Sequence, residues 1–202
     1  MGRVGFRAAI ASALALTIAT AAPLSASERA PSARNAPSEY SARGQQIRQA
    51  NYSVRQTSDH ASRILALHNA ERRRLRVPDL VWNAHLEREA ADWANHLSRS
   101  GVLQHADDRT RNGTGENLWM GTSGGWDVDG MVGMFLDERR HYRHATFPDV
   151  SNTGNWADVG HYTQIVWRDT REVGCAVASA RGNDVLVCRY FPAGNVMGRR
   201  AH

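Results

Sequence analysis

The chain has 202 residues and carries 25 basic residues against 20 acidic ones, which gives a formal net charge of +5. The excess lies near the N-terminus, because residues 1–57 hold seven Arg against two acids, whereas residues 58–202 hold 18 Arg and 18 acids. A nucleic-acid-binding protein needs a clustered basic face, so the even balance of the larger part argues against that class.

The first 26 residues have the pattern of a signal peptide. Positive charge in residues 1–7 precedes an uncharged run of small and apolar residues over 8–22, the order of an n-region and an h-region. The run is shorter than the roughly 20 residues that cross a bilayer. Cleavage after Ala21, Ala22 or Ala26 fits the small residues there. We therefore expect a secreted protein, extracellular or periplasmic, without a membrane span after cleavage; an uncleaved anchor is the alternative.

Residues 27–57 are rich in Ser, Arg, Ala, Gln and Pro and show no apolar period. Such composition predicts a disordered tether. The remaining chain of about 145 residues is enough for one domain with a proper core. We place this domain at residues 58–194, with 195–202 as a C-terminal tail, and expect a monomer.

Helical periodicity dominates the first part of the domain. Apolar residues recur at the spacing of an amphipathic helix in three stretches, at residues 57–75, 83–101 and 127–142. Residues 57–59 and Asn83 are the expected N-caps of the first two helices, and Gly101 is the expected stop of the second. In the third helix Glu138 shares a face with apolar side chains, which is unusual for a carboxylate.

The last third of the domain changes period. Residues 161–167 alternate between two faces, and this pattern predicts a strand that places His161 on the same side as Ile165 and Trp167. Helices followed by antiparallel strands indicate an α+β layered domain.

Two further strands, at residues 173–178 and 185–190, form a predicted hairpin. If the turn centres on Arg181 and Gly182, Cys175 and Cys188 lie directly opposite each other. These are the chain's two cysteines. An even pair in an exported chain indicates a disulfide.

Four segments in this order resemble the CAP domain, which cysteine-rich secretory proteins, antigen 5 and pathogenesis-related 1 proteins share. They are His68-Asn-Ala-Glu-Arg72, Gly115-Glu-Asn-Leu118, the segment Gly160-His-Tyr-Thr-Gln-Ile-Val-Trp-Arg-Asp-Thr170, and Val185-Leu-Val-Cys-Arg-Tyr-Phe-Pro-Ala-Gly-Asn-Val196. A single short match is weak, but four in sequence are specific. The resemblance implies a three-layer α-β-α sandwich with a central antiparallel sheet.

The resemblance also implies a central cavity with two His and two Glu. Matched by motif, these are His105, Glu116, Glu138 and His161. Two imidazoles and a carboxylate suit Zn²⁺ or another divalent cation. The competing interpretation is a polar cluster that ties helix to sheet and binds nothing tightly.

The other motif residues are expected to be structural. His68, Asn69 and Arg72 should order the first helix and its neighbouring loop, with Arg72 in a run of arginines at a solvated helix end. Gly115 and Asn117 should form a turn that presents Glu116. The remaining positions in this group are Tyr162, Gln164, Trp167, Tyr190, Gly194 and Asn195.

We consider two classes of function. The first is an extracellular binding module whose unknown ligand is a lipid or sterol, held by Trp119, Trp126 and Trp156 at the rim in a groove distinct from the His and Glu cavity. The second is a metal-assisted hydrolase in which zinc activates water and a spare Glu acts as base. Ser123 lies in a Gly-x-Ser-x-Gly match, but the surrounding glycines favour a mobile loop over a nucleophile elbow.

Overall fold

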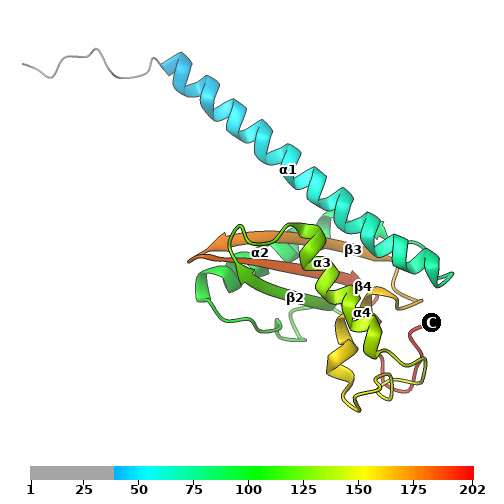
Figure 1. Cartoon of the computed structure of the whole chain (residues 1–202). Helices are drawn as coiled ribbons and strands as arrows, with labels where there is room; N and C mark the ends of the chain where they lie inside the picture. The colour runs from blue at the N-terminus through cyan, green and yellow to red at the C-terminus, as the bar shows by residue number, and fades with distance from the viewer. Residues whose placement is uncertain (1–38) are drawn as a thin grey trace, which may run out of the picture. The chain divides into compact units, whose positions relative to one another are not determined.

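The computed structural model describes residues 39–202 (Figure 1). The predicted signal peptide and the first part of the tether lie outside these residues. The elements are, in order, α1 (Glu39–Arg74), β1 (Val81–Trp82), α2 (Ala84–Ser100), β2 (Gly115–Thr122), α3 (Val128–Asp137), the 3₁₀ helices η1 (Glu138–His141) and η2 (Trp156–Val159), α4 (Gly160–Ile165), β3 (Glu172–Ala180) and β4 (Asn183–Phe191).

Helix α1 is longer than the sequence pattern predicts. It begins at Glu39, so the prediction of disorder is wrong for residues 39–57, and the predicted N-cap at residues 57–59 lies inside the helix. The composition of this segment does not exclude a helix, because Gln, Arg, Glu and Ala are good helix formers even without an apolar stripe. The end at Arg74 agrees with the predicted stop ahead of Pro78.

The four strands form one sheet in the order β1-β3-β4-β2. β3 and β2 both pair antiparallel with β4, as expected, whereas the short β1 runs parallel to β3 and makes the sheet mixed. Arg181 and Gly182 form the predicted hairpin turn, with φ values of 54° and 78°. Cys175 lies opposite Cys188 and the two form a disulfide, which confirms the prediction.

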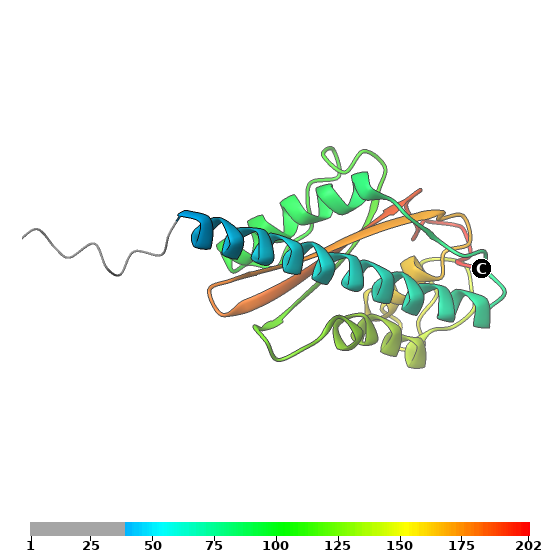
Figure 2. The same cartoon turned by 90° about the horizontal axis from the view of Figure 1, so that it is seen from above.

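Helices cover both faces of the sheet (Figures 1 and 2). Alternation along the strands separates two apolar clusters. One cluster joins α2 to one face through Ala90, Ala94, Leu97, Leu118, Val185 and Val187. The other joins α1, α3 and α4 to the opposite face through Ile64, Phe135, Ile165, Trp119, Leu186 and Tyr190. The fold is therefore the expected α+β three-layer sandwich.

Helix α2 begins and ends where the sequence indicates. The side chain of Asn83 accepts hydrogen bonds from the backbone N–H groups of His85 and Leu86. Gly101 adopts a left-handed φ of 72°, and its N–H donates to the carbonyl of Leu97. The predicted third helix is divided in two, because α3 ends at Asp137 and Glu138 begins η1.

The prediction of a strand at residues 161–167 is wrong, because α4 occupies most of this segment. Tyr162 to Ile165 are all buried, so no solvent-facing side exists from which a helical period could be recognised. Glu138 also holds the start of this helix, since its Oε2 accepts from the N–H groups of His161 and Tyr162, each at 3.0 Å. A short run with both sides buried gives an ambiguous period.

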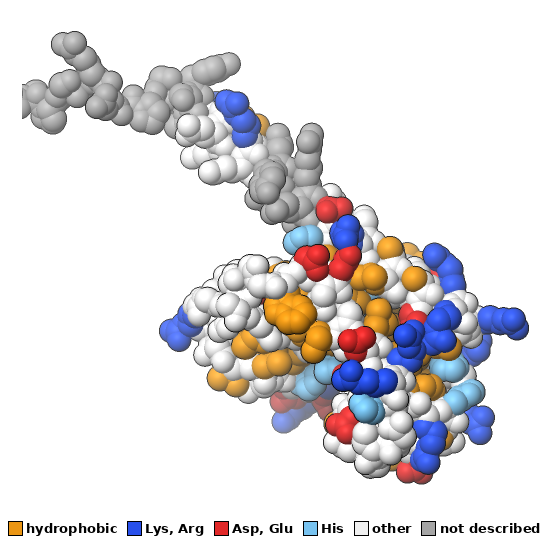
Figure 3. Space-filling view, viewed as in Figure 1, with side chains coloured by type: hydrophobic (Ala, Val, Ile, Leu, Met, Phe, Trp, Pro, Cys, Tyr) orange, Lys and Arg blue, Asp and Glu red, His pale blue; other side chains and the backbone are white. Residues whose placement is uncertain are grey.

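The arginine run at the end of α1 is only partly solvated. Arg73, Arg74 and Arg76 are exposed, whereas Arg72 is fully buried, contrary to prediction. Figure 3 shows arginine side chains gathered where α1 ends. Within residues 39–202 no helix is both long enough and apolar enough to cross a bilayer.

Candidate functional site

The site forms where β2 begins at the edge of the sheet. Glu116 pairs in register with Arg189 of β4, on the face that α2 covers, and the next residue, Asn117, points to the opposite face. A cleft of about 690 Å³ opens at this end of the strand, and both His105 and His161 line it. The strand thus separates two His–Glu pairs that approach one cleft from opposite faces of the sheet.

The first pair is His105 with Glu116. Nδ1 of His105 lies 2.7 Å from Oε1 of Glu116, which also accepts from the N–H of Ala106 at 3.1 Å. Oε2 forms an ion pair of 3.0 Å with Nη2 of Arg189. The Glu116 side chain has no exposed surface, while that of His105 is 58% exposed. A buried carboxylate needs such partners, and together they fix the imidazole that it holds.

The second pair is His161 with Glu138. Nδ1 of His161 lies 2.5 Å from Oε1 of Glu138, whose other oxygen accepts the two backbone N–H groups at the start of α4. The imidazole also stacks on Phe135, with ring centroids 4.6 Å apart. Glu138 therefore orients His161, which lines the cleft, but does not line the cleft itself.

In both pairs the carboxylate engages Nδ1 and leaves Nε2 without a hydrogen bond or ion pair to any of residues 39–202. This is how metal-ligating imidazoles are commonly oriented, with a carboxylate on the other ring nitrogen. The described residues contain no group of three or more His, Cys, Asp or Glu side chains placed to hold one ion. The four predicted residues are thus two potential ligands and two orienting carboxylates.

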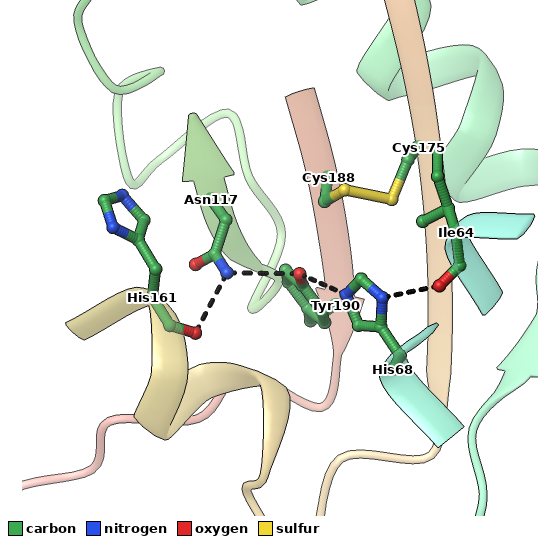
Figure 4. The surroundings of a disulfide bond; sticks show 7 residues. All are labelled: Ile64, His68, Asn117, His161, Cys175, Cys188 and Tyr190. Atoms are coloured by element: carbon green, nitrogen blue, oxygen red, sulfur yellow. Dashed lines mark hydrogen bonds between the residues drawn. A yellow bond between two sulfur atoms is a disulfide. The ribbon is translucent and has the colours of Figure 1, made fainter. Parts of the chain in front are cut away.

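A buried hydrogen-bond network lies behind His161 (Figure 4). The Nδ2 group of Asn117 donates to the carbonyl of His161 and to the hydroxyl of Tyr190, each at 3.1 Å. Nε2 of His68 lies 2.9 Å from the same hydroxyl, and Nδ1 lies 2.8 Å from the carbonyl of Ile64. Burial lowers the pKa of His68 to about 4 and raises that of Tyr190. The network connects α1, β2, β4 and α4.

Gln164 also lines the cleft. Its Oε1 accepts from the N–H of Gly194 at 2.9 Å, and its Nε2 donates to Thr170 at 3.2 Å. A Cβ on Gly115 would lie 2.0 Å from the Gln164 Oε1, and one on Gly194 would lie 2.8 Å from its Nε2. A side chain at either glycine would therefore force the Gln164 amide to move away from these hydrogen-bond partners.

Asn69 and Arg72 hold the loop that follows α1. Asn69 exchanges two hydrogen bonds with the backbone of Leu80. The Arg72 guanidinium donates to the carbonyl groups of Pro78, Ile165, Trp167 and Thr170. Burial lowers its pKa to about 10, so the group stays protonated at neutral pH.

The remaining motif residues also serve the scaffold. The Tyr162 hydroxyl donates to Glu71 at 2.8 Å, and Trp167 is buried in the core. Asn195 accepts from Thr163 at 2.7 Å and donates to the carbonyl of Gly160 at 2.9 Å. The Asn195 contacts attach α4 to the segment that follows β4, and the Tyr162 contact attaches α4 to α1.

Two predictions about the surroundings of the site are wrong. Gly115 and Asn117 lie in β2 and do not form a turn. Of the three predicted rim tryptophans, Trp156 lines the cleft, whereas Trp119 is 9% exposed in the core and Trp126 packs edge-on against it. Alternation explains the position of Trp119, because it shares the face of β2 with Asn117.

The Ser123 hydroxyl donates to Asp184 Oδ1 at 2.8 Å, and Gly124 N–H donates to the other oxygen. Helix α3 begins only at Val128, so the strand-turn-helix geometry of a nucleophile elbow is lacking at this position. The serine closes the turn after β2.

Arg189 is a site residue that the sequence analysis missed. It pairs with Glu116 and is 5% exposed. The signal was present in the alternation of β4, where Arg189 follows Val185 and Val187 on an otherwise apolar face. A cation at such a position indicates a buried anionic partner.

Comparisons with known proteins agree on one family. Residues 65–190 match the cysteine-rich secretory protein family, CAP. Secreted protein RBT4 of Candida albicans is 37% identical over 142 residues, which cover 68% of this chain and 36% of that protein. Golgi-associated plant pathogenesis-related protein 1 of Homo sapiens is 32% identical over 135 residues, 66% of this chain and 83% of that protein. Pathogenesis-related protein 1B of Nicotiana tabacum is 35% identical over 136 residues, 67% and 76% of the two chains.

Among solved structures, that of NaASP2 with Zn²⁺ has a TM-score of 0.60 at 24% identity and covers 72% of this chain and 86% of that one. At this level of identity the likeness shows the fold.

Proposed function

Because the chain belongs to the cysteine-rich secretory protein (CAP) family, we propose that it is an exported binding module whose cleft holds a divalent cation of the Zn²⁺ type between His105 and His161. The main support for this proposal is the orientation of the two imidazoles. In each of them a carboxylate engages Nδ1, so that Nε2 remains available to a cation. Neutral imidazole is a common zinc ligand, and a carboxylate on its other nitrogen raises its basicity.

The donor set fits a loosely held cation. Two imidazole nitrogens are fewer than the three protein ligands of most catalytic zinc sites, so water or a group from a binding partner would complete the shell. A structure of NaASP2, which shares the fold, was determined with Zn²⁺. We therefore expect modest affinity and a cation that takes part in ligand capture.

A metal-assisted hydrolase is less well supported. Such an enzyme needs a carboxylate that is free to act as base. Both oxygens of Glu116 contact His105, Ala106 or Arg189, and both oxygens of Glu138 contact α4. Neither carboxylate is spare, and we do not propose catalysis.

Lipid or sterol binding stays a weaker proposal. Of the three aromatic residues on which it rested, only Trp156 lies at the cleft. Trp119 lies in the core, so it does not form the rim of a groove distinct from the His and Glu cavity. An extracellular location is supported by the name of the relative RBT4, a secreted protein, and by the N-terminal leader pattern.

Zn²⁺ titration by calorimetry tests the proposed site. The wild type should bind near neutral pH, and the His105→Ala, His161→Ala double variant should lose most of the heat. Binding should also weaken as pH falls and the imidazoles protonate. A His85→Ala, His96→Ala variant is the matched control, because both residues are exposed on α2. Equal isotherms for the two folded double variants would leave only a structural role for the cluster.

A further inference from the structure

The loop between α2 and β2 carries the chain's one Asn-Gly dipeptide, Asn112-Gly113. Both residues are exposed and left-handed, with φ values of 49° and 79°. Gly113 lines the cleft that contains His105 and His161. We propose that Asn112 is a site of spontaneous deamidation, which places a new carboxylate at the rim of this cleft.

The reaction needs no enzyme or oxidant. The backbone nitrogen of Gly113 attacks Cγ of Asn112, the amide leaves as ammonia, and a five-membered succinimide remains. Water then opens the ring at either carbonyl and gives aspartate or isoaspartate. The net change replaces NH₂ by OH, and the new acid ionises at neutral pH.

The local structure leaves every participant in this step available. Neither the side chain of Asn112 nor the N–H of Gly113 forms a hydrogen bond with residues 39–202. Nothing lies within 4 Å of the position that a Cβ on Gly113 would occupy. The absent Cβ therefore leaves an open approach to the nucleophilic nitrogen.

Asp129-Gly130 provides an internal contrast, because an Asp-Gly pair forms the same succinimide by losing water. There the N–H of Gly130 donates to Oδ1 of Asp127 at 2.8 Å, in the first turn of α3. The Asp129 carboxylate is paired with Arg63. A nitrogen held in a helix cap and a carboxylate held by a guanidinium are both restrained from cyclising.

The product would change both charge and backbone at the rim. Asp108 and Arg111 form an ion pair at the cleft, and a carboxylate at position 112 adds one negative charge to the loop that carries this pair. Isoaspartate also adds one backbone atom inside the turn in which the N–H of Thr114 donates to the carbonyl of Arg111 at 2.9 Å. We expect altered cation attraction at the cleft, a consequence that rests on the proposed function.

Peptide mapping by mass spectrometry tests the modification without reference to metal. The folded protein is aged at neutral pH beside a denatured sample, and isoaspartate is measured at positions 112 and 129. Product should accumulate at Asn112 in the folded protein at a rate comparable to that in the denatured one, while Asp129 reacts only after denaturation. An Asn112→Gln variant should accumulate none. Protection of Asn112 by folding, or equal reaction at Asp129 in the folded chain, would overturn the proposal.

Discussion

The hydroxyl of Tyr190 lies 2.9 Å from Nε2 of His68, and neither side chain has measurable exposure. Nδ1 of His68 faces the carbonyl of Ile64, which can only accept, so Nδ1 carries the proton. Nε2 must then accept from Tyr190, whose oxygen accepts in turn from Asn117. The arrangement requires a neutral imidazole in one tautomer.

This requirement predicts a loss of stability in acid. The pKa of His68 is about 4 in the folded protein, below its ordinary value near 6.5. As pH falls below about 6.5, the unfolded chain takes up a proton that the native state rejects, so stability declines until about pH 4 by roughly 3 kcal/mol. Urea unfolding across this range should show a smaller pH dependence for His68→Gln than for the wild type. Equal slopes would contradict the assignment.

Arg72 should be among the costliest positions to change. Arg72→Met removes the donors of four backbone carbonyls, and buried acceptors without partners each cost about 1–3 kcal/mol. We expect a loss of at least about 3 kcal/mol of unfolding free energy. Arg73→Met is the control, because this side chain is 65% exposed and should change stability by about 0.5 kcal/mol or less. Similar denaturation midpoints for the two variants would refute the prediction.

The disulfide should contribute substantially to the stability of the hairpin. Cys175 and Cys188 are separated by 13 positions, and closing a loop of this length stabilises a fold by about 3 kcal/mol. Reduction should therefore lower the thermal midpoint without changing the mass of the chain beyond two added hydrogens. The oxidised and reduced wild types, compared by calorimetry, provide the measurement, and coincident transitions would count against a stabilising role.

Glu138 should influence cation binding without acting as a ligand. Glu138→Gln leaves one carbonyl oxygen for three donors, the Nδ1 group of His161 and two backbone N–H groups. We expect Zn²⁺ affinity to fall by about 10–100-fold, as is typical when an orienting partner is removed. Glu87→Gln is the control, since Glu87 accepts from Trp82 away from the cleft. An unchanged affinity in Glu138→Gln would mean that the carboxylate does not orient the imidazole.

Local signals in the sequence were sufficient for several elements. The cap at Asn83, the stop at Gly101 and the turn at Arg181 each depend on the conformational preference of one or two residues. The strand pattern of β3 and β4 predicted which cysteines would face each other, because side-chain alternation and turn position together set the register. The same reasoning did not reveal the helical state of residues 39–57, where the sequence shows no apolar period.

What the sequence determined by itself was therefore the family, the fold class and the disulfide, whereas its motifs only nominated four site residues, of which Glu138 does not line the cleft. Only the tertiary structure decided which His pairs with which Glu. His105 and Glu116 pair on one face of the sheet, whereas Glu138 and His161 pair on the other. The conformation of α4 was likewise decided by burial on all sides and by the carboxylate of Glu138 at its first turn. Contacts between residues that are distant in sequence leave no local period, so packing alone established which nitrogen of each imidazole remains available.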